Sequence, residues 1–147
     1  MTYRICRASS KHLGDINRLI EATKIGDHPL EKLPGPFWFV RQDGQIVGIM
    51  GGEFIEGQGI YIGLYLAVDP AYRKRGIGMA LFAHALEHAR GCGARTFAFL
   101  TMYYLFNRFK RRGFKTSPRQ LLPEALRNHW MFVTKRYMKC AAMIKQD

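Results

Sequence analysis

The segment from Tyr65 to Phe82 constrains the fold of this chain most strongly. It runs from an aliphatic strand, through a proline turn, into glycines that open an amphipathic helix. The N–H groups in the first turn of a helix lack intrahelical acceptors, and the helix dipole places partial positive charge there. Gly76 and Gly78 carry no Cβ, so an anion can approach the backbone of residues 74–79 closely. The segment therefore predicts a strand–turn–helix unit with an anion-binding turn.

One other interpretation of this turn remains open, that of an ordinary structural connection. A glycine-rich strand-to-helix turn also serves as an ordinary connection, although Arg73, Lys74 and Arg75 add positive charge beside this one. The dinucleotide fingerprint G-x-G-x-x-G and the P-loop pattern G-x-x-x-x-G-K-[ST] both differ from the spacing found here. We therefore favour a phosphate-binding turn over a plain connection.

Hydrophobic periodicity along the rest of the chain predicts alternating strands and helices. Asp43-Gly44, between two apolar runs, predicts a β-hairpin. The predicted strands are 2–8, 37–41, 45–55, 60–68, 96–100 and 140–145, and the predicted helices are 9–22, 78–90, 103–112 and 123–137. This order predicts an α/β fold with a mixed central sheet and helices on both faces. The length of 147 residues predicts one domain, 1–147.

Composition narrows the classes of partner. There are 23 Lys and Arg against 11 Asp and Glu, a net charge of +12, which favours anionic ligands. Cys6, Cys92 and Cys140 are too far apart for a disulfide framework or a zinc-ligand pattern, so we expect no metal site and a reducing environment. No apolar run is long enough for a membrane span or a signal peptide, which predicts a cytoplasmic protein without membrane partners.

A family resemblance rests on the glycine turn. The pattern Arg73-x-x-Gly76-x-Gly78, preceded by Leu-Ala-Val-Asp-Pro at 66–70, resembles the acetyl-CoA pyrophosphate loop of the GNAT N-acetyltransferases. The resemblance implies acetyl-CoA as cosubstrate, bound between splayed parallel strands at 60–68 and 96–100, with a bulge in the first of them. The residues that it implies in cofactor binding are Leu66, Ala67, Val68, Arg73, Lys74, Arg75, Gly76, Ile77, Gly78, Met79 and Phe109.

The second half of the chain has a narrower resemblance. Leu100-Thr101, the run from Phe109 to Phe114, Leu-Leu-Pro-Glu at 121–124 and Ala-Met-Ile at 142–144 are similar to the acetyltransferase domain of bacterial N-acetylglutamate synthases. Residues from Tyr103 onward hold eleven Lys and Arg against Glu124 and Asp147, so most of the positive charge lies there.

The side chains that usually move protons in this family are replaced. Ile62 stands at the usual glutamate position and Phe109 at the usual tyrosine position. Glu53 is the candidate base, acting through water, and Tyr104 is the candidate acid. The alternatives are Glu56 for the base and Tyr65 or Tyr103 for the acid. The carbonyl donor implied by the family is the backbone N–H of Leu66 or Val68.

The resemblance implies an N-acetyltransferase that moves the acetyl group of acetyl-CoA to the primary amine of a small molecule, and the net charge favours an acceptor such as an acidic amino acid. A protein or peptide amine is the first alternative acceptor. A non-catalytic CoA-binding or nucleic-acid-binding module is the second alternative, prompted by Ile62, Phe109 and the net charge. Nucleic acid is the weaker partner because no RRM, KH or helix-turn-helix signature is present. Analogy with the family suggests a homodimer.

Overall fold

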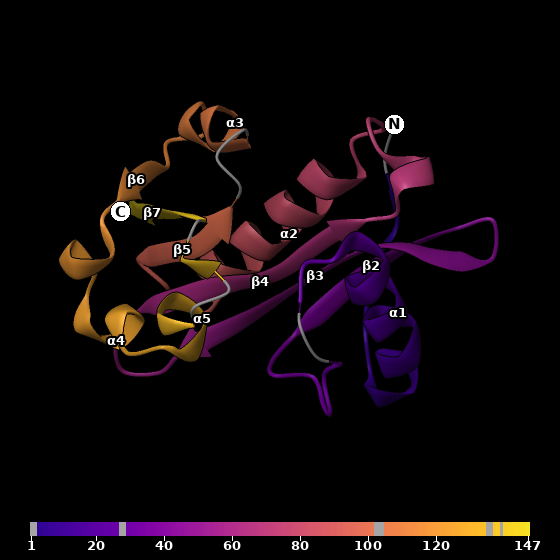
Figure 1. The fold of residues 1–147 in the computed structure, drawn as a ribbon, viewed down its shortest axis with the longest axis horizontal. Helices are drawn as coiled ribbons and strands as arrows, with labels where there is room; N and C mark the ends of the chain where they lie inside the picture. Colours follow the sequence, from indigo (N-terminus) through magenta and orange to yellow (C-terminus); the bar gives the residue numbers. More distant parts are fainter. Residues whose placement is uncertain (1–2, 27–28, 102–104, 135–136, 139) are drawn as a thin grey trace. The chain divides into compact units, whose positions relative to one another are not determined.

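The computed structural model describes residues 3–26, 29–101, 105–134, 137–138 and 140–147 (Figure 1). Its strands form one mixed sheet in the order β1-β2-β3-β4-β5-β7-β6. The predicted mixed α/β sheet is confirmed. The chain divides into two compact units, Met1–Glu53 with Gly63–Cys92 and Phe54–Ile62 with Gly93–Asp147. No helix in the described residues is both long and apolar enough to span a bilayer.

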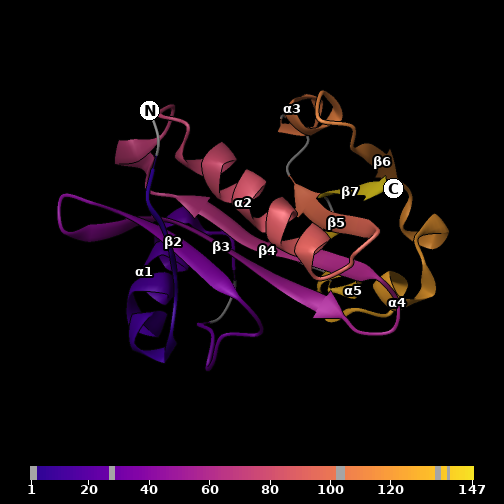
Figure 2. The same ribbon diagram turned by 180° about the vertical axis from the view of Figure 1, so that it is seen from behind.

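The first unit is built on strands that can be followed side by side in Figures 1 and 2. β1 and β3 both pair antiparallel with β2. Its elements are β1 (Ile5–Arg7), η1 (Ser10–His12), α1 (Leu13–Thr23), β2 (Phe37–Gln42), β3 (Gln45–Ile55), β4 (Ile60–Val68, of which residues 63–68 belong here), η2 (Pro70–Tyr72) and α2 (Ile77–Gly91).

The two helices of this unit pack on opposite faces of its strands. Phe37 and Phe39 of β2 lie in the cluster that holds the apolar side of α1, including Ile16 and Leu19. Trp38, between them, stands edge-on to His84 and His88 of α2. Alternate residues of a strand point to opposite faces of the sheet. The side chains of β2 therefore contact α1 on one face and α2 on the other.

The second unit has a parallel and an antiparallel part. β4 pairs parallel with β5 from Ile60↔Thr96 to Ile62↔Ala98, and β7 pairs antiparallel with both β5 and β6. An aromatic core fills this unit, where Phe99 packs against Phe109 and Phe114. Its further elements are β5 (Thr96–Thr101), α3 (Phe106–Lys110), β6 (Lys115–Ser117), η4 (Arg119–Leu121), α4 (Glu124–Arg127), α5 (Trp130–Val133) and β7 (Ala141–Gln146).

Most predicted elements are confirmed to within a few residues. The hairpin has its turn at Asp43 (φ 52°) and Gly44 (φ 78°), two left-handed residues that match the twist of the flanking strands. The helix predicted at 78–90 is α2, with Gly76 as its N-cap. The last strand begins at Ala141 rather than Cys140.

One prediction for the C-terminal part is wrong, and one strand there was not predicted. The single helix predicted at 123–137 is two single-turn helices, because His129 is extended (ψ 138°) and its Nδ1 accepts a hydrogen bond from the Met131 amide at 3.2 Å. β6 has no counterpart in the prediction; its three residues are too few for a periodic pattern. The helix predicted at 103–112 is α3, Phe106–Lys110, and residues 102–104 lie outside the described part.

Candidate cofactor-binding turn

A bulge-like distortion interrupts β4 just before the predicted site. Tyr65 has φ 52°, a left-handed conformation inside a strand. A bulky side chain adopts this conformation at a cost of about 1–2 kcal/mol, so the surrounding packing must hold it. A left-handed residue within a strand is one signature of a β-bulge, which turns the following backbone groups out of the regular ladder. Leu66, Ala67 and Val68 follow directly, as the family resemblance implies.

Asp69 and Pro70 redirect the chain after β4. The Asp69 Oδ1 accepts a hydrogen bond from the Ala71 amide at 2.9 Å, and its carbonyl accepts one from the Tyr72 amide at 2.8 Å. Pro70 at the first position of η2 supplies a fixed φ where no N–H is needed. The Asp69 amide donates to the Val47 carbonyl at 2.8 Å, so the turn stays joined to β3. The chain therefore leaves the strand through a rigid, capped turn.

The next residues place successive amides at the beginning of α2. Lys74 (φ 64°) and Gly76 (φ 83°) are left-handed, and alternation of this kind directs neighbouring N–H groups toward one anion-sized hollow. The first helical bond runs from the Ala80 amide to the Gly76 carbonyl at 3.0 Å. Among the described residues, the amides of residues 74–79 have no protein acceptor. They are free to bind an anion.

The two glycines of the turn have different roles. Gly76 has a left-handed φ, which residues with a side chain adopt poorly. Space is not the reason for glycine here, because a Cβ at this position would meet no protein atom within 4 Å. Gly78 has an ordinary φ, and a Cβ on it would lie 3.5 Å from the Val68 Cγ2, a normal contact. The backbone conformation therefore favours glycine at position 76 and leaves position 78 free for alanine.

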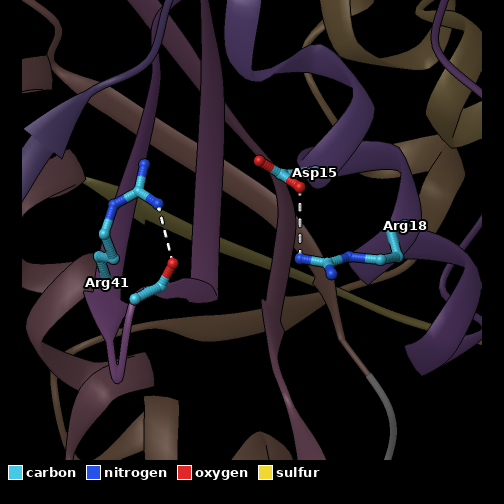
Figure 3. Close-up of polar contacts among 4 residues, drawn as sticks. Asp15, Arg18 and Arg41 are labelled. Carbon is cyan, nitrogen blue, oxygen red and sulfur yellow. Dashed lines mark hydrogen bonds and ion pairs between the residues drawn. The ribbon is translucent and has the colours of Figure 1, made fainter.

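The cations of the turn have no carboxylate partner within the described part of the chain. Arg73, Lys74 and Arg75 are all exposed. The ion pairs found there are Arg18 with Asp15 on α1, at 3.4 Å (Figure 3), and Arg90 with Glu87 on α2, at 3.9 Å. None of these three cations forms an ion pair within 4 Å among the described residues. Together with the amides, this donor set fits the diphosphate of a coenzyme.

Close packing holds the beginning of α2 against β3. A Cβ on Gly48 would lie 2.6 Å from the Ile77 Cγ2 and 3.1 Å from the Leu81 Cδ1. Ile77 and Leu81 are fully buried. The missing side chain at position 48 lets the first turn of α2 settle on the strand, which fixes where its amides point.

The remaining predicted residues are placed as follows. Glu53 is half-buried on β3, in the same unit as the turn, and Glu56 is exposed in the turn after that strand. Phe109 is only 3% exposed, and its ring stands edge-on to Phe99 with the centroids 4.6 Å apart. Tyr104 and Tyr103 lie outside the described residues. No group of three His, Cys, Asp or Glu in the described part is arranged to hold a metal ion.

Sequence reasoning missed the residues that support the turn from elsewhere. Tyr72 donates a hydrogen bond to the Asp43 carboxylate at 2.7 Å, and Tyr3 donates one to the Arg75 carbonyl at 2.6 Å. Asp43 was visible in the sequence only as part of a hairpin turn. These contacts join residues 29 and 72 positions apart, which no local pattern reveals.

Solved structures with the same fold include several acetyltransferases. N-acetylglutamate synthase from Neisseria gonorrhoeae, complexed with coenzyme A and N-acetyl-glutamate, superposes with a TM-score of 0.79 at 20% identity, over 99% of this chain and 36% of that one. This chain thus spans about a third of that enzyme's length. Rv2747 from Mycobacterium tuberculosis, in complex with CoA, gives 0.78 at 18% identity, over 98% and 99% of the two chains.

A third likeness is to an enzyme with a protein substrate. The ribosomal-protein-S18-alanine N-acetyltransferase from Escherichia coli gives a TM-score of 0.69 at 15% identity, over 97% of this chain and 91% of that one. No curated protein sequence matches the chain. At these identities the superpositions establish the fold, and the acceptor differs from one neighbour to another.

The sequence itself matches a family over the segment that contains the turn. The match to the Acetyltransferase (GNAT) family covers residues 9–114, from the beginning of the first helix to the end of the aromatic core. It includes the strand, the distortion at Tyr65 and the whole turn at the beginning of α2. The chain therefore belongs to the GNAT family of acetyltransferases, enzymes that use acetyl-CoA as cosubstrate.

Proposed function

We propose that this acetyltransferase acts on the primary amine of a small molecule that carries a carboxylate, such as an acidic amino acid. The turn from Arg73 to Met79 is the observation that carries the cofactor part of the proposal. Its free amides, and the three cations that form no ion pair in the described part of the chain, suit the diphosphate of acetyl-CoA. The charge of the second unit carries the acceptor part.

The binding mode follows from the order of features along the chain. Beyond the distortion at Tyr65, the backbone of residues 66–68 pairs with the amide groups of the pantetheine arm as a neighbouring strand would. The amides of residues 74–79 then hold the diphosphate, and the side chains of Arg73 to Arg75 neutralise its charge. Both parts of this surface belong to one unit of the chain.

The chemistry needs few side chains. Bound acetyl-CoA supplies an activated acyl group as a thioester. The backbone N–H of Leu66 or Val68 donates to the thioester oxygen as negative charge develops on it. Glu53 takes the proton of the attacking amine through a water molecule. Tyr104 returns a proton to the departing sulfur. General acid–base steps of this kind contribute about 10²–10⁴-fold in rate, and positioning of the amine supplies much of the rest.

The charge distribution supports an acidic acceptor. The second unit holds 12 Lys and Arg against three Asp and Glu, whereas the first holds 11 against eight. A surface with this excess attracts carboxylates and repels basic peptides. The similarity of residues 100–144 to N-acetylglutamate synthases agrees with such an acceptor, and the Neisseria structure contains N-acetyl-glutamate.

Thiol release from acetyl-CoA over a panel of amines tests the proposal. The panel contains acidic, neutral and basic amino acids and peptides with acidic or basic N-terminal sequences. We expect the highest kcat/KM for an acidic amino acid and none for the basic peptides. Release with peptides alone would replace the small-molecule acceptor by a protein one. Coenzyme binding without release for any amine would contradict the proposed acceptor class as a whole.

Glu53→Gln is the companion variant, since it keeps the size of the side chain and removes its basicity. We expect kcat to fall about 10²-fold with the affinity for CoA unchanged. Glu56→Gln, in the turn after the same strand, is the matched control and should keep kcat. Equal losses in the two variants would exclude Glu53 as the base.

A further inference from the structure

We propose that Asp43, Tyr72, Arg75 and Tyr3 form a clamp that sets the conformation of the diphosphate-binding turn before the coenzyme arrives. In this clamp, a hairpin tip and the N-terminal segment act as positioning elements for a turn remote from them in sequence. The inference rests on the proposed cofactor site and adds to it the residues that preorganise the site.

The rigid end of the clamp is the β2–β3 hairpin. Asp43 and Gly44 form a two-residue turn with both φ angles positive, and Gln42 pairs with Gln45 across it. This turn type leaves the hairpin tip little freedom. The Asp43 carboxylate is therefore a fixed acceptor, and its Oδ2 receives the Tyr72 hydroxyl at 2.7 Å. The same hydrogen bond raises the pKa of Tyr72 above its ordinary value.

The Tyr72 ring carries the next contact. The Arg75 guanidinium lies over its face, 4.9 Å from the ring centroid, within the range of a cation–π interaction. The Arg75 carbonyl accepts a hydrogen bond from the Tyr3 hydroxyl at 2.6 Å. Arg75 is thus held at its side chain by η2 and at its backbone by the segment before β1.

These contacts enclose a strained residue. Lys74 lies between Arg73, whose Nε donates to the Val68 carbonyl at 3.2 Å, and the doubly held Arg75. Its φ of 64° is unfavourable for a residue with a side chain. Such a conformation persists where the flanking residues determine it. The clamp thereby keeps the amides of the turn converged, which lowers the ordering cost of binding.

Equilibrium binding of CoA to the full chain tests the clamp. Tyr72→Phe removes the hydroxyl and keeps the ring under Arg75. Asp43→Gly removes the carboxylate, and glycine suits the positive φ at that position. We expect the Kd for CoA to rise about fivefold in each variant, the equivalent of about 1 kcal/mol, while kcat at saturation stays within about twofold because no group of the clamp touches the reacting atoms. Asp43→Asn, which keeps an acceptor oxygen, should recover most of the affinity.

A double variant and a matched control test whether loss of this hydrogen bond causes the weaker CoA binding. Both single variants remove the same hydrogen bond between Tyr72 and Asp43. The double variant, Tyr72→Phe with Asp43→Gly, should therefore raise the Kd for CoA no further than either single change. Arg41→Gln breaks a contact at the same hairpin turn, the hydrogen bond from the Arg41 Nη1 to the Gly44 carbonyl at 3.3 Å (Figure 3). It leaves the hydrogen bond between Tyr72 and Asp43 in place. It should leave the Kd unchanged.

A readout on the free protein separates the clamp from the cofactor site. In Tyr72→Phe the backbone amide resonances of residues 74 and 75 should shift in the absence of any coenzyme, because the backbone conformation of the turn changes. Unchanged amides together with an unchanged Kd would overturn the clamp while leaving the cofactor site in place. Failure of the unaltered protein to bind CoA would overturn the cofactor site and, with it, the clamp.

Discussion

Gly48 of β3 lies directly beneath Ile77, the first residue of α2: a Cβ on the glycine would come within 2.6 Å of the Ile77 Cγ2. Real Cβ atoms do not approach other atoms this closely, so a larger residue at position 48 must displace the buried side chains of Ile77 and Leu81 or the helix that carries them. The first turn of α2 supplies the amides of the proposed cofactor site. Both the packing of the core and the position of the amides in the proposed site therefore depend on Gly48.

Gly48→Ala should therefore reduce both stability and cofactor affinity. Overpacking of a buried site of this kind costs about 1–3 kcal/mol of the free energy of unfolding, and displacement of the Ile77 amide weakens CoA binding. Chemical denaturation and calorimetric titration with CoA measure the two effects. Gly91→Ala is the control, because Gly91 has open space around its Cβ position and lies at the end of α2. It should stabilise the protein slightly. Equal stability of both variants would contradict the packing argument.

The two glycines of the turn should respond differently to substitution. Gly76→Glu places bulk and negative charge at the proposed diphosphate position and should abolish CoA binding. Gly78→Ala makes only a normal contact with Val68 and should preserve stability. Calorimetric titration of each folded variant with CoA gives the comparison. An unchanged affinity in Gly76→Glu would place the diphosphate elsewhere.

His88 should make stability depend on pH near neutrality. Burial lowers the pKa of His88 below its ordinary value, with smaller contributions from Arg7 and His84. The unfolded chain therefore binds the proton more readily than the folded one. Stability from this group is present above about pH 6.5, the ordinary value for histidine, and is lost as the pH falls through the folded pKa. The ring also stands edge-on to Trp38, with centroids 5.0 Å apart.

Denaturation curves at several pH values measure this dependence. His88→Phe keeps an aromatic ring beside Trp38 and removes the titrating group, so its stability should fall less on acidification than that of the unaltered protein. A slope that stays the same in His88→Phe would assign the pH dependence to other residues.

Arg119 should be essential for the C-terminal segment. Its guanidinium donates to three carbonyls, those of Phe132 at 3.3 Å, Cys140 at 3.1 Å and Tyr137 at 2.6 Å. Lysine lacks the planar fork that reaches all three. Arg119→Lys should therefore lower the free energy of unfolding by about 2–4 kcal/mol. Arg127→Lys, at an exposed position on α4, should cost less than about 0.5 kcal/mol. Chemical denaturation checks both, and similar losses would exclude the proposed role of Arg119.

The local sequence pattern was sufficient to predict those elements whose conformation depends on a few neighbouring residues. The Asp43-Gly44 hairpin, the helix ending near Gly91 and the apolar strand at Thr96 follow from turn chemistry and periodicity that act over a few residues. The C-terminal part failed for the opposite reason. Its apolar residues suit one long helix, but the His129 side chain caps a new turn, and the guanidinium of Arg119 holds the chain that follows.

By itself, the sequence determined the order of strands and helices, the surplus of positive charge and the glycine turn that identified the family, because each of these is a local or compositional property. Only the tertiary structure decided which partners support that turn. The approach of Gly48 to Ile77 and the bond from Tyr72 to Asp43 join positions 29 apart in sequence. Contacts of this kind form only when the strands have paired and α2 has packed on them. Which atoms come into contact depends on the close packing of the folded chain and not on residue type alone.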